Sequence, residues 1–377
     1  NRHAGLIRSS NLCTEIFQNT GPGKTVVKVK LNNGELVFFD ENEMVELNNG
    51  RMKKASKLRE LDVLESHSDT GIFHVYKEIE ERETAVCNLA SINLSKVNTK
   101  EKIEEIVPIA VRMLDNVIDL NFYPELSVKE TNIKSRAIGL GMMGEAQMLA
   151  EEKIYFGSQE HRERIDEVCE LLSYNAIKGS MELSKEKGSY PNFVGSNWSQ
   201  GIMPIDIANE KARNLTKRLF TYNWNELRAE VMKNGIRNGY LMAIAPTSSI
   251  SILTGTTPTI EPVYKRKWFE ENLSGLIPVC VPNLNTETWQ YYESAFDIDQ
   301  IKIVETASIR QKWIDQGQSL NIFMLLNKAN GKTLNEIYMT AWQLGCKSTY
   351  YLRSQSPEAI IDENEKLNSG PACSGCE

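Results

Sequence analysis

Near the amino end of the sequence, amide, thiol and carboxylate side chains have the spacing of a small catalytic cluster. Asn11, Cys13 and Glu15 occupy alternate positions in Ser10-Asn11-Leu12-Cys13-Thr14-Glu15-Ile16. In an extended segment, residues at alternate positions lie on one face. A thiol between a hydrogen-bonding amide and a general base would suit thiol-based catalysis. Any strand could carry this pattern, so the pattern does not assign a reaction by itself.

A pair of thiols stands at the other end of the sequence. Cys373 and Cys376 form a C-x-x-C motif in the polar stretch that follows Ser356. A zinc site would need a second pair of ligands, and the sequence offers none, so we predict no bound metal. We interpret the two thiols as a redox pair that exchanges its disulfide from a flexible tail. The alternative is a disordered tail with two idle thiols.

Hydroxyl side chains follow an apolar run at 241–245. The segment Pro246-Thr247-Ser248-Ser249-Ile250 stands where a strand ends and a helix begins. Hydroxyls and unpaired N–H groups at a helix start favour a phosphate. An ordinary N-cap uses the same residue types, and these residues alone do not separate the two readings.

Two further motifs have plain structural interpretations. Arg136–Gly144 contains G-x-G-x-x-G, but the preceding 128–135 is polar, whereas a dinucleotide-binding fold needs a buried strand there. We therefore predict that these glycines allow close backbone packing. In a strand, the adjacent Tyr350 and Tyr351 would point to opposite faces, one to the core and one to solvent.

The composition excludes several classes of protein. The chain has 377 residues with 43 basic and 50 acidic side chains, giving a formal net charge of −7. A mildly acidic chain argues against binding to nucleic acid or membrane surfaces. No apolar run is long enough to span a bilayer, and the odd count of seven Cys argues against a secreted disulfide framework. These features indicate a cytoplasmic location.

Periodicity predicts an α/β fold with a mainly parallel sheet or barrel. Apolar residues have helical spacing at 101–120, 160–187 and 333–345, and 239–245 reads as a short buried strand. Two strand-like runs, 25–31 and 35–40, flank an Asn-Asn-Gly turn and predict a β-hairpin. We interpret 21–70 as a small inserted β module.

Taken together and in order, these motifs resemble the C-terminal part of the large, catalytic subunit of class I ribonucleotide reductase. The resemblance covers nearly everything except 21–70. It is carried by Ser10–Ile16, Cys87–Leu94, Arg136–Gly144, Pro246–Pro262, Ser348–Arg353 and the terminal cysteine pair. It implies half of a ten-stranded α/β barrel, made by 1–20 and 71–355, with the inserted module 21–70 and a flexible redox tail at 356–377.

The resemblance also implies a chemistry for the ribose of the substrate. Cys13 matches the thiol that becomes a thiyl radical and takes the 3′-hydrogen. Asn11 and Glu15 match the groups that hold the ribose hydroxyls, with Glu15 as general base. Cys87 matches one of two thiols that reduce the 2′-carbon, and no residue here matches the second. The diphosphate-binding loop corresponds to Pro246, Thr247, Ser248, Ser249 and Ile250.

The remaining matches concern radical and electron supply. Tyr350 and Tyr351 match a pair that relays the radical from a metal-containing small subunit, so no cofactor is expected on this chain itself. Cys373 and Cys376 match the tail pair that re-reduces the active-site disulfide and is reduced by thioredoxin or glutaredoxin. The substrates implied are ribonucleoside diphosphates.

The sequence begins at Asn1 without Met, only 12 residues before Cys13. We therefore expect one half of a split large subunit of the phage type, completed by a separate N-terminal half and located in the host cytoplasm if phage-encoded. Two alternatives stay open. One is a non-catalytic remnant or scaffold of a reductase complex. The other is a thiol oxidoreductase that uses only the C-x-x-C motif, although that motif lies in a polar tail and not in a βαβ unit.

Overall fold

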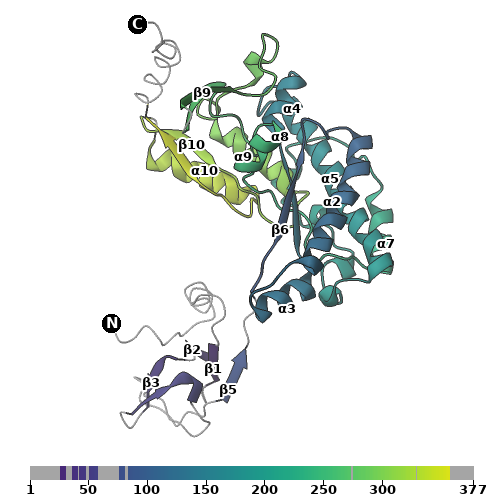
Figure 1. The fold of residues 1–377 in the computed structure, drawn as a ribbon, viewed down its shortest axis with the longest axis vertical. Helices are drawn as coiled ribbons and strands as arrows, with labels where there is room; N and C mark the ends of the chain where they lie inside the picture. The colour runs from purple at the N-terminus through teal and green to yellow at the C-terminus, as the bar shows by residue number, and fades with distance from the viewer. Residues whose placement is uncertain are drawn as a thin grey trace. The chain divides into compact units, whose positions relative to one another are not determined.

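The computed structural model describes residues 26–30, 36–40, 42–47, 51–57, 76–80, 84–272, 275–327 and 329–356. The chain divides into two compact units, shown in Figure 1. One comprises 1–86 and 122–132, and the other comprises 87–121 and 133–377. Each unit is described by itself.

The first unit contains short antiparallel strands. β1 (Val26–Lys30) pairs with β2 (Leu36–Asp40) on one side and with β5 (Tyr76–Glu80) on the other, so the predicted hairpin is confirmed. β3 (Met44–Glu46) and β4 (Met52–Lys54) form a second hairpin, which the 3₁₀ turn η1 (Ala55–Lys57) follows. The described buried apolar side chains of this unit are Phe39, Val45, Leu47 and Ala55.

A parallel sheet organises the second unit. β6 (Asn88–Asn93) pairs in parallel with β7 (Ile138–Met143). The N–H and C=O of Leu140 bond to Leu241 and Ala243 at 2.8 and 3.2 Å, which is the parallel pattern and adds 240–244 as the next strand. Ile244 then bridges in parallel to Gln318. This order explains why all six residues of β7 are buried, as expected of a strand covered on both faces.

The segment that contains Gln318 leads to the last strand of the sheet. Beyond Gln318 it becomes β10 (Ile322–Leu325), which pairs in parallel with β11 (Leu352–Gln355). Five parallel segments therefore lie in the order β6, β7, 240–244, 316–325 and β11. The predicted α/β class is confirmed. The described segments do not close into a barrel, so the ten-stranded barrel stays a prediction.

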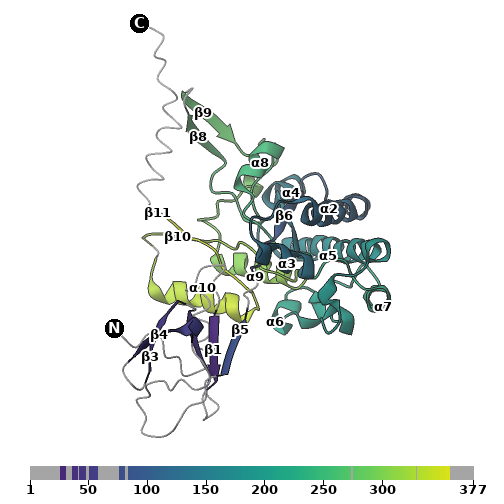
Figure 2. The same ribbon diagram turned by 60° about the horizontal axis from the view of Figure 1, so that its bottom comes forward.

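Helices connect the parallel strands. They are α2 (Lys100–Leu120), α3 (Leu126–Ser135), α4 (Glu145–Glu151), α5 (Gln159–Lys187), α6 (Glu210–Arg213), α7 (Trp224–Asn234), α8 (Ser248–Thr254), α9 (Gln300–Gln311) and α10 (Gly331–Gln343). Short 3₁₀ turns are η2 (Pro191–Phe193), η3 (Trp198–Gln200), η4 (Pro204–Ile207) and η5 (Trp289–Tyr291), and β8 (Lys267–Asn272) with β9 (Gly275–Cys280) forms a hairpin. Figures 1 and 2 show α2, α5 and α7 on one side of β6, with α10 on the other. The three helices predicted from periodicity are confirmed to within two residues.

The packing of α2 on α5 follows from their sequences. α2 buries Ile103, Val107, Val111 and Ile118, which recur at three- and four-residue spacing. Thr99 and Ser158 cap the two helices by accepting hydrogen bonds from Lys102 and His161 N–H groups. Gly179 of α5 faces Pro108 of α2, where a Cβ atom would lie 3.0 Å from the Pro108 Cα. The helices are therefore in close contact at that point.

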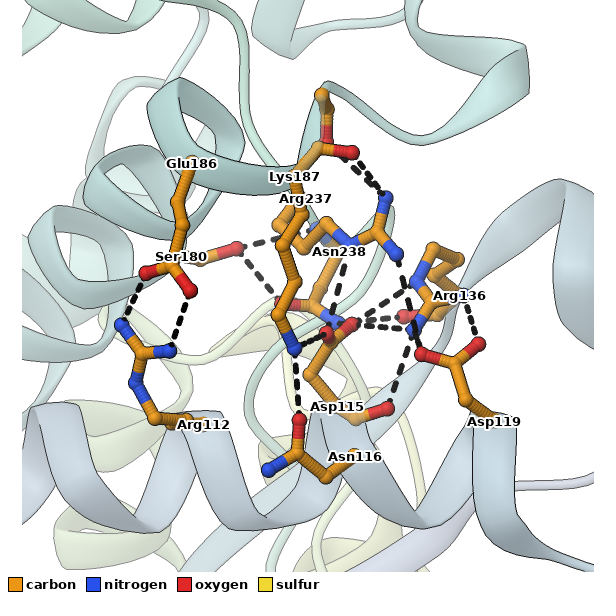
Figure 3. A network of polar contacts seen from close by, with 11 residues as sticks. Arg112, Asp115, Asn116, Asp119, Arg136, Ser180, Glu186, Lys187, Arg237 and Asn238 are labelled. Carbon is orange, nitrogen blue, oxygen red and sulfur yellow. Dashed lines mark hydrogen bonds and ion pairs between the residues drawn. The ribbon is translucent and has the colours of Figure 1, made fainter.

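A buried carboxylate joins α2 to the sheet (Figure 3). Asp115 is fully buried and accepts hydrogen bonds from Arg136 Nε at 2.9 Å, Asn238 Nδ2 at 3.1 Å and Arg237 Nε at 3.3 Å. Lys187, at the end of α5, lies 3.5 Å away. Arg136 lies two residues before β7 begins, and Asn238 lies two residues before the strand at 240–244. One charge thus fixes the entry of two neighbouring strands.

A second buried charge cluster joins three helices. Glu145 of α4 accepts hydrogen bonds from His161 of α5, at 2.9 Å, and from Arg310 of α9, whose Nε lies at 2.9 Å. His161 Nδ1 accepts from the Gly157 N–H, so Nε2 carries the proton that is donated to Glu145. Burial lowers the pKa of His161, and the nearby Arg310 holds the pKa of Glu145 below its usual value although burial alone would raise it.

We predict that Asp115→Asn lowers the free energy of unfolding by about 3 to 5 kcal/mol, because it leaves buried cations without their counter-charge. The matched control on the same helix is Arg112→Ala. Arg112 forms an exposed ion pair with Glu186, which should contribute less than about 1 kcal/mol. Urea denaturation of both variants measures the difference. Equal losses would contradict the role assigned to Asp115.

Candidate functional site

Cys87 stands directly before β6, on the face of the sheet opposite the core. Side chains alternate along β7, so Ile138, Leu140 and Met142 enter the main hydrophobic core while Gly139 and Gly141 face the other side. Cys87 is an exposed residue on that other side. A Cβ atom on Gly139 would lie 3.1 Å from the Cys87 sulfur and 2.4 Å from Leu89 Cδ2. The missing side chain therefore makes the room that this thiol occupies.

The glycine motif has the packing role that we predicted. At Gly141 a Cβ atom would lie 2.4 Å from the Ala243 carbonyl oxygen, which belongs to the next strand. At Gly144, φ is +80° and a Cβ atom would lie 2.5 Å from Thr256 Oγ1. All three glycines are needed for close approach.

The electrostatics around Cys87 favour the neutral thiol. Neighbouring atoms displace water from the sulfur and the Asp315 carboxylate repels a thiolate, which together raise the Cys87 pKa to about 11. Asp315 itself accepts hydrogen bonds from the Leu241 and Met242 N–H groups at 2.8 and 2.7 Å. Burial raises the Asp315 pKa to about 6, against the opposing effect of these amides.

The predicted phosphate loop surrounds the start of α8. Thr247 has φ of +54° and occupies the N-cap position, but its side chain does not cap the helix. Its Oγ1 instead accepts from the Thr259 N–H at 2.8 Å. Ser248, Ser249 and Ile250 are exposed. The N-cap alternative is therefore not realised by this side chain, and within the described part of the chain no side chain caps the first N–H groups of α8.

Tyr350 and Tyr351 lie against each other, contrary to the expectation of opposite faces. Their ring centroids are 3.9 Å apart, and the Tyr350 hydroxyl donates to that of Tyr351 at 3.1 Å. Both residues precede β11, so strand alternation does not apply to them. This hydrogen bond raises the pKa of Tyr350. Both rings are about half exposed, at 46% and 52%.

Buried polar groups hold the tyrosine pair in place. The Tyr351 N–H donates to Asn321 Oδ1 at 3.1 Å, and Asn321 Nδ2 donates to the buried Glu261 at 2.9 Å. The Arg353 guanidinium lies 5.3 Å from the ring centroids of both Tyr351 and Tyr264. The backbone and one ring face of Tyr351 are therefore fixed from the protein interior.

Several predicted site residues lie outside the described part of the chain. They are Asn11, Cys13, Glu15, Cys373 and Cys376. Of the others, the structure places Cys87 on the face of the sheet opposite the main core and brings Tyr350 and Tyr351 together. Sequence reasoning missed Asp315, Asn321 and Arg353. In the sequence, these three residues are polar positions beside short apolar runs. That pattern is too common to identify a site residue.

The described residues hold no cluster of three or more His, Cys, Asp or Glu side chains that could bind a metal ion. None of the helices in this part of the chain is long and apolar enough to cross a membrane.

Comparison with known proteins identifies the family. The sequence profile described as "Ribonucleotide reductase, barrel domain" matches residues 1–352. The chain belongs to this ribonucleotide reductase family. It is 58% identical over 380 residues to a ribonucleoside-diphosphate reductase subunit alpha of Helicobacter pylori (strain J99), covering 100% of this chain and 48% of the relative. The corresponding subunit of Treponema pallidum is 36% identical, covering 95% of this chain and 37% of the relative.

A third reductase alpha subunit, from Chlamydia muridarum, is 41% identical over 76% of this chain and 32% of the relative. The chain thus spans about half or less of the length of these relatives. The predicted resemblance to the C-terminal part of a large reductase subunit is confirmed.

We predict that Cys87 is alkylated slowly in the folded chain of residues 1–377. A pKa of about 11 in place of the ordinary value near 9 leaves about one hundredth of the thiolate at pH 8, and only the thiolate reacts with iodoacetamide. Mass spectrometry of the Cys87 peptide after timed labelling between pH 7 and 11 gives the rate. A Cys87 rate that reaches its plateau below pH 9 would contradict this prediction.

We also predict that Tyr351→Phe lowers the pKa of Tyr350, because it removes the hydroxyl to which Tyr350 donates. A 3-fluorotyrosine placed at position 350 reports this pKa by ¹⁹F NMR titration. Tyr264→Phe serves as the control, since the Tyr264 ring also contacts Arg353 but its hydroxyl is not the acceptor for Tyr350. A pKa at position 350 that is unchanged by Tyr351→Phe would show that the two hydroxyls are not bonded in solution.

Proposed function

We propose that this chain is the C-terminal catalytic portion of a ribonucleoside-diphosphate reductase large subunit. It would reduce ribonucleoside diphosphates to deoxyribonucleoside diphosphates by a thiyl-radical mechanism. The observation that carries this proposal is the 58% identity to reductase alpha subunits along the whole chain. The alternative, a non-catalytic remnant or scaffold, is disfavoured because Asn11, Cys13, Glu15, Cys87 and the paired tyrosines are all present.

In the proposed reaction, the Cys13 thiyl radical removes the 3′-hydrogen of the substrate ribose and returns it at the end. Asn11 and Glu15 hold the ribose hydroxyls, and Glu15 acts as general base. Cys87 and a second thiol from outside this chain supply two electrons and two protons. The 2′-hydroxyl leaves as water, and the two thiols become a disulfide.

The surroundings of Cys87 support its part in this reaction. A reducing thiol must keep its hydrogen until it reacts, and the low polarity and the Asp315 charge favour the protonated form. Gly139 leaves the room beside β7 in which the sulfur lies. Neither feature suits a nucleophilic cysteine, which needs a low pKa.

The diphosphate of the substrate would bind at the loop of Pro246, Thr247, Ser248, Ser249 and Ile250. Ser248 and Ser249 are exposed, so their hydroxyls and N–H groups are accessible to an anion. Thr247 would act indirectly, since its hydroxyl is already bonded to the loop at Thr259.

Radical supply would come through the tyrosine pair. We propose that a metal-containing small subunit delivers the radical, that Tyr351 receives it and that Tyr350 passes it toward Cys13. The ring separation of 3.9 Å and the hydroxyl contact support transfer between the two rings. No cofactor would be bound by this chain.

Cys373 and Cys376 would re-reduce the active-site disulfide and be reduced in turn by thioredoxin or glutaredoxin. A tail pair suits this exchange because a buried disulfide cannot meet a bulky protein reductant directly. Residues 356–377 would serve as the tether, and 21–70 as a surface insertion. We place the enzyme in the cytoplasm, where thiols stay reduced.

The reaction would also need the rest of the catalytic subunit. This proposal rests on the coverage of only 48% of the Helicobacter pylori relative. The decisive experiment mixes the full chain with a polypeptide that carries the remaining N-terminal portion of that relative, together with a small subunit and thioredoxin. The product measured is dCDP formed from CDP.

We predict dCDP formation by the complete mixture and none by this chain alone. Cys13→Ser and Cys87→Ser should each reduce the product to the level found without small subunit, because each removes an obligatory thiol. Cys280→Ser is the control, since Cys280 is an exposed free thiol with no proposed role. Undiminished dCDP from the Cys13→Ser mixture would refute the mechanism, and dCDP from residues 1–377 alone would refute the need for the rest of the subunit.

A further inference from the structure

The side chain of Gln316 reaches across one strand of the sheet to the Cys87 thiol. The Gln316 backbone N–H donates to the Met242 carbonyl at 3.1 Å, which places it on the strand next to 240–244. Its side-chain Nε2 donates to the carbonyl of Ile138 in β7 at 2.7 Å. Its Oε1 lies 3.8 Å from the Cys87 sulfur, within hydrogen-bond distance for a thiol donor. The two residues are 229 positions apart in the sequence.

The bond to Ile138 settles how the Gln316 amide is oriented. A carbonyl oxygen only accepts, so the NH₂ group must face Ile138 and the amide oxygen must face the sulfur. An amide oxygen is an acceptor without a proton, so it stabilises the S–H form of Cys87 and offers nothing to a thiolate. The backbone of Gln316 is itself supported by Gln311, whose Nε2 donates to the Gln316 carbonyl at 2.9 Å.

We propose that Gln316 is a positioning residue for Cys87: its amide, fixed on the Ile138 carbonyl, directs the thiol hydrogen and keeps the sulfur protonated until it reacts. This proposal rests on the proposed function, in which Cys87 gives up hydrogen to the substrate. A thiol that rotated freely or ionised early would be a poorer hydrogen donor, so Gln316 would increase the rate of turnover without contacting the substrate.

Few charged groups lie near Cys87, so the effect of Gln316 on the reactivity of the thiol can be measured. Asp315 is the titratable group that faces the sulfur from the strand of Gln316. The nearest cation to Asp315 is Lys347, whose Nζ donates to the Asp315 carbonyl at 2.5 Å. The other acceptor near the sulfur is the uncharged Asn88 carbonyl oxygen at 3.7 Å, which no variant below changes, and the glycine beside the sulfur is Gly139 of β7. Asp315 itself is unchanged in every variant described below.

The test measures the pH profile of Cys87 alkylation by iodoacetamide in the full chain, resolved by mass spectrometry of the Cys87 peptide. Gln316→Met has nearly the same length but no acceptor, so we expect Cys87 to react about threefold faster at pH 8, the effect of one modest hydrogen bond. Gln316→Glu places a carboxylate at the sulfur, so we expect Cys87 to react several-fold more slowly there.

Gln311→Leu is the matched control, because it removes support from the Gln316 backbone without touching the sulfur. A merely structural role predicts that this control changes the profile as much as Gln316→Met does, and that result would overturn the proposal. An unchanged profile in Gln316→Met would overturn it as well. Thermal melts of all three variants identify any variant that is unfolded. If Gln316→Met is unfolded, the test rests on Gln316→Glu, and a Cys87 alkylation rate that is not slowed in that variant would overturn the proposal.

In the reassembled enzyme, Gln316→Met should lower kcat for CDP reduction about three- to tenfold and leave KM unchanged, since only the reacting thiol is affected. A raised KM with unchanged kcat would overturn the positioning role. If the wild-type mixture forms no dCDP, the proposed function fails, whereas the alkylation profile still decides whether Gln316 controls the thiol.

Discussion

The close contact between β7 and the strands beside it determines where every proposed group on the sheet lies. Gly139 and Gly141 place no side chain on the face opposite the core, so neighbouring backbone and the Cys87 sulfur come within distances that any Cβ atom would prevent. Gln316 reaches across the strand at 240–244, and this also depends on the absence of side chains at the two glycines. With larger residues in β7, the thiol and the amide could not meet.

The charged residues at the edge of the sheet serve the same geometry. Asp115 joins Arg136, at the entry to β7, with Asn238, at the entry to the adjacent strand. Such a cluster is costly to bury, but it fixes the positions of several elements at once when every partner is present. The Glu145, His161 and Arg310 cluster does this for α4, α5 and α9. The helices are therefore fixed by directional bonds as well as by apolar packing.

Local patterns in the sequence predicted the parts of the fold that local physics decides. The helices at 101–120 and 160–187 follow from apolar spacing, and the packing role of Gly139 and Gly141 follows from the polar stretch before them. Strand alternation alone predicted the relation of Tyr350 to Tyr351 wrongly, because it applies only inside a strand, whereas the resemblance had matched the two residues to a pair that acts together. The contact between Cys87 and Gln316 could not be predicted, since no local pattern relates residues 229 positions apart.

Glu261 links two regions that the sequence presents separately. Its carboxylate lies 3.4 Å from the hydroxyl of Thr259, whose N–H bonds to Thr247 at the start of α8, and it also accepts from Asn321, which holds the backbone of Tyr351. The serine-bearing turn and the aromatic rings consequently share one anchor. Each region reaches the Glu261 carboxylate through one intermediate residue, Thr259 on one side and Asn321 on the other.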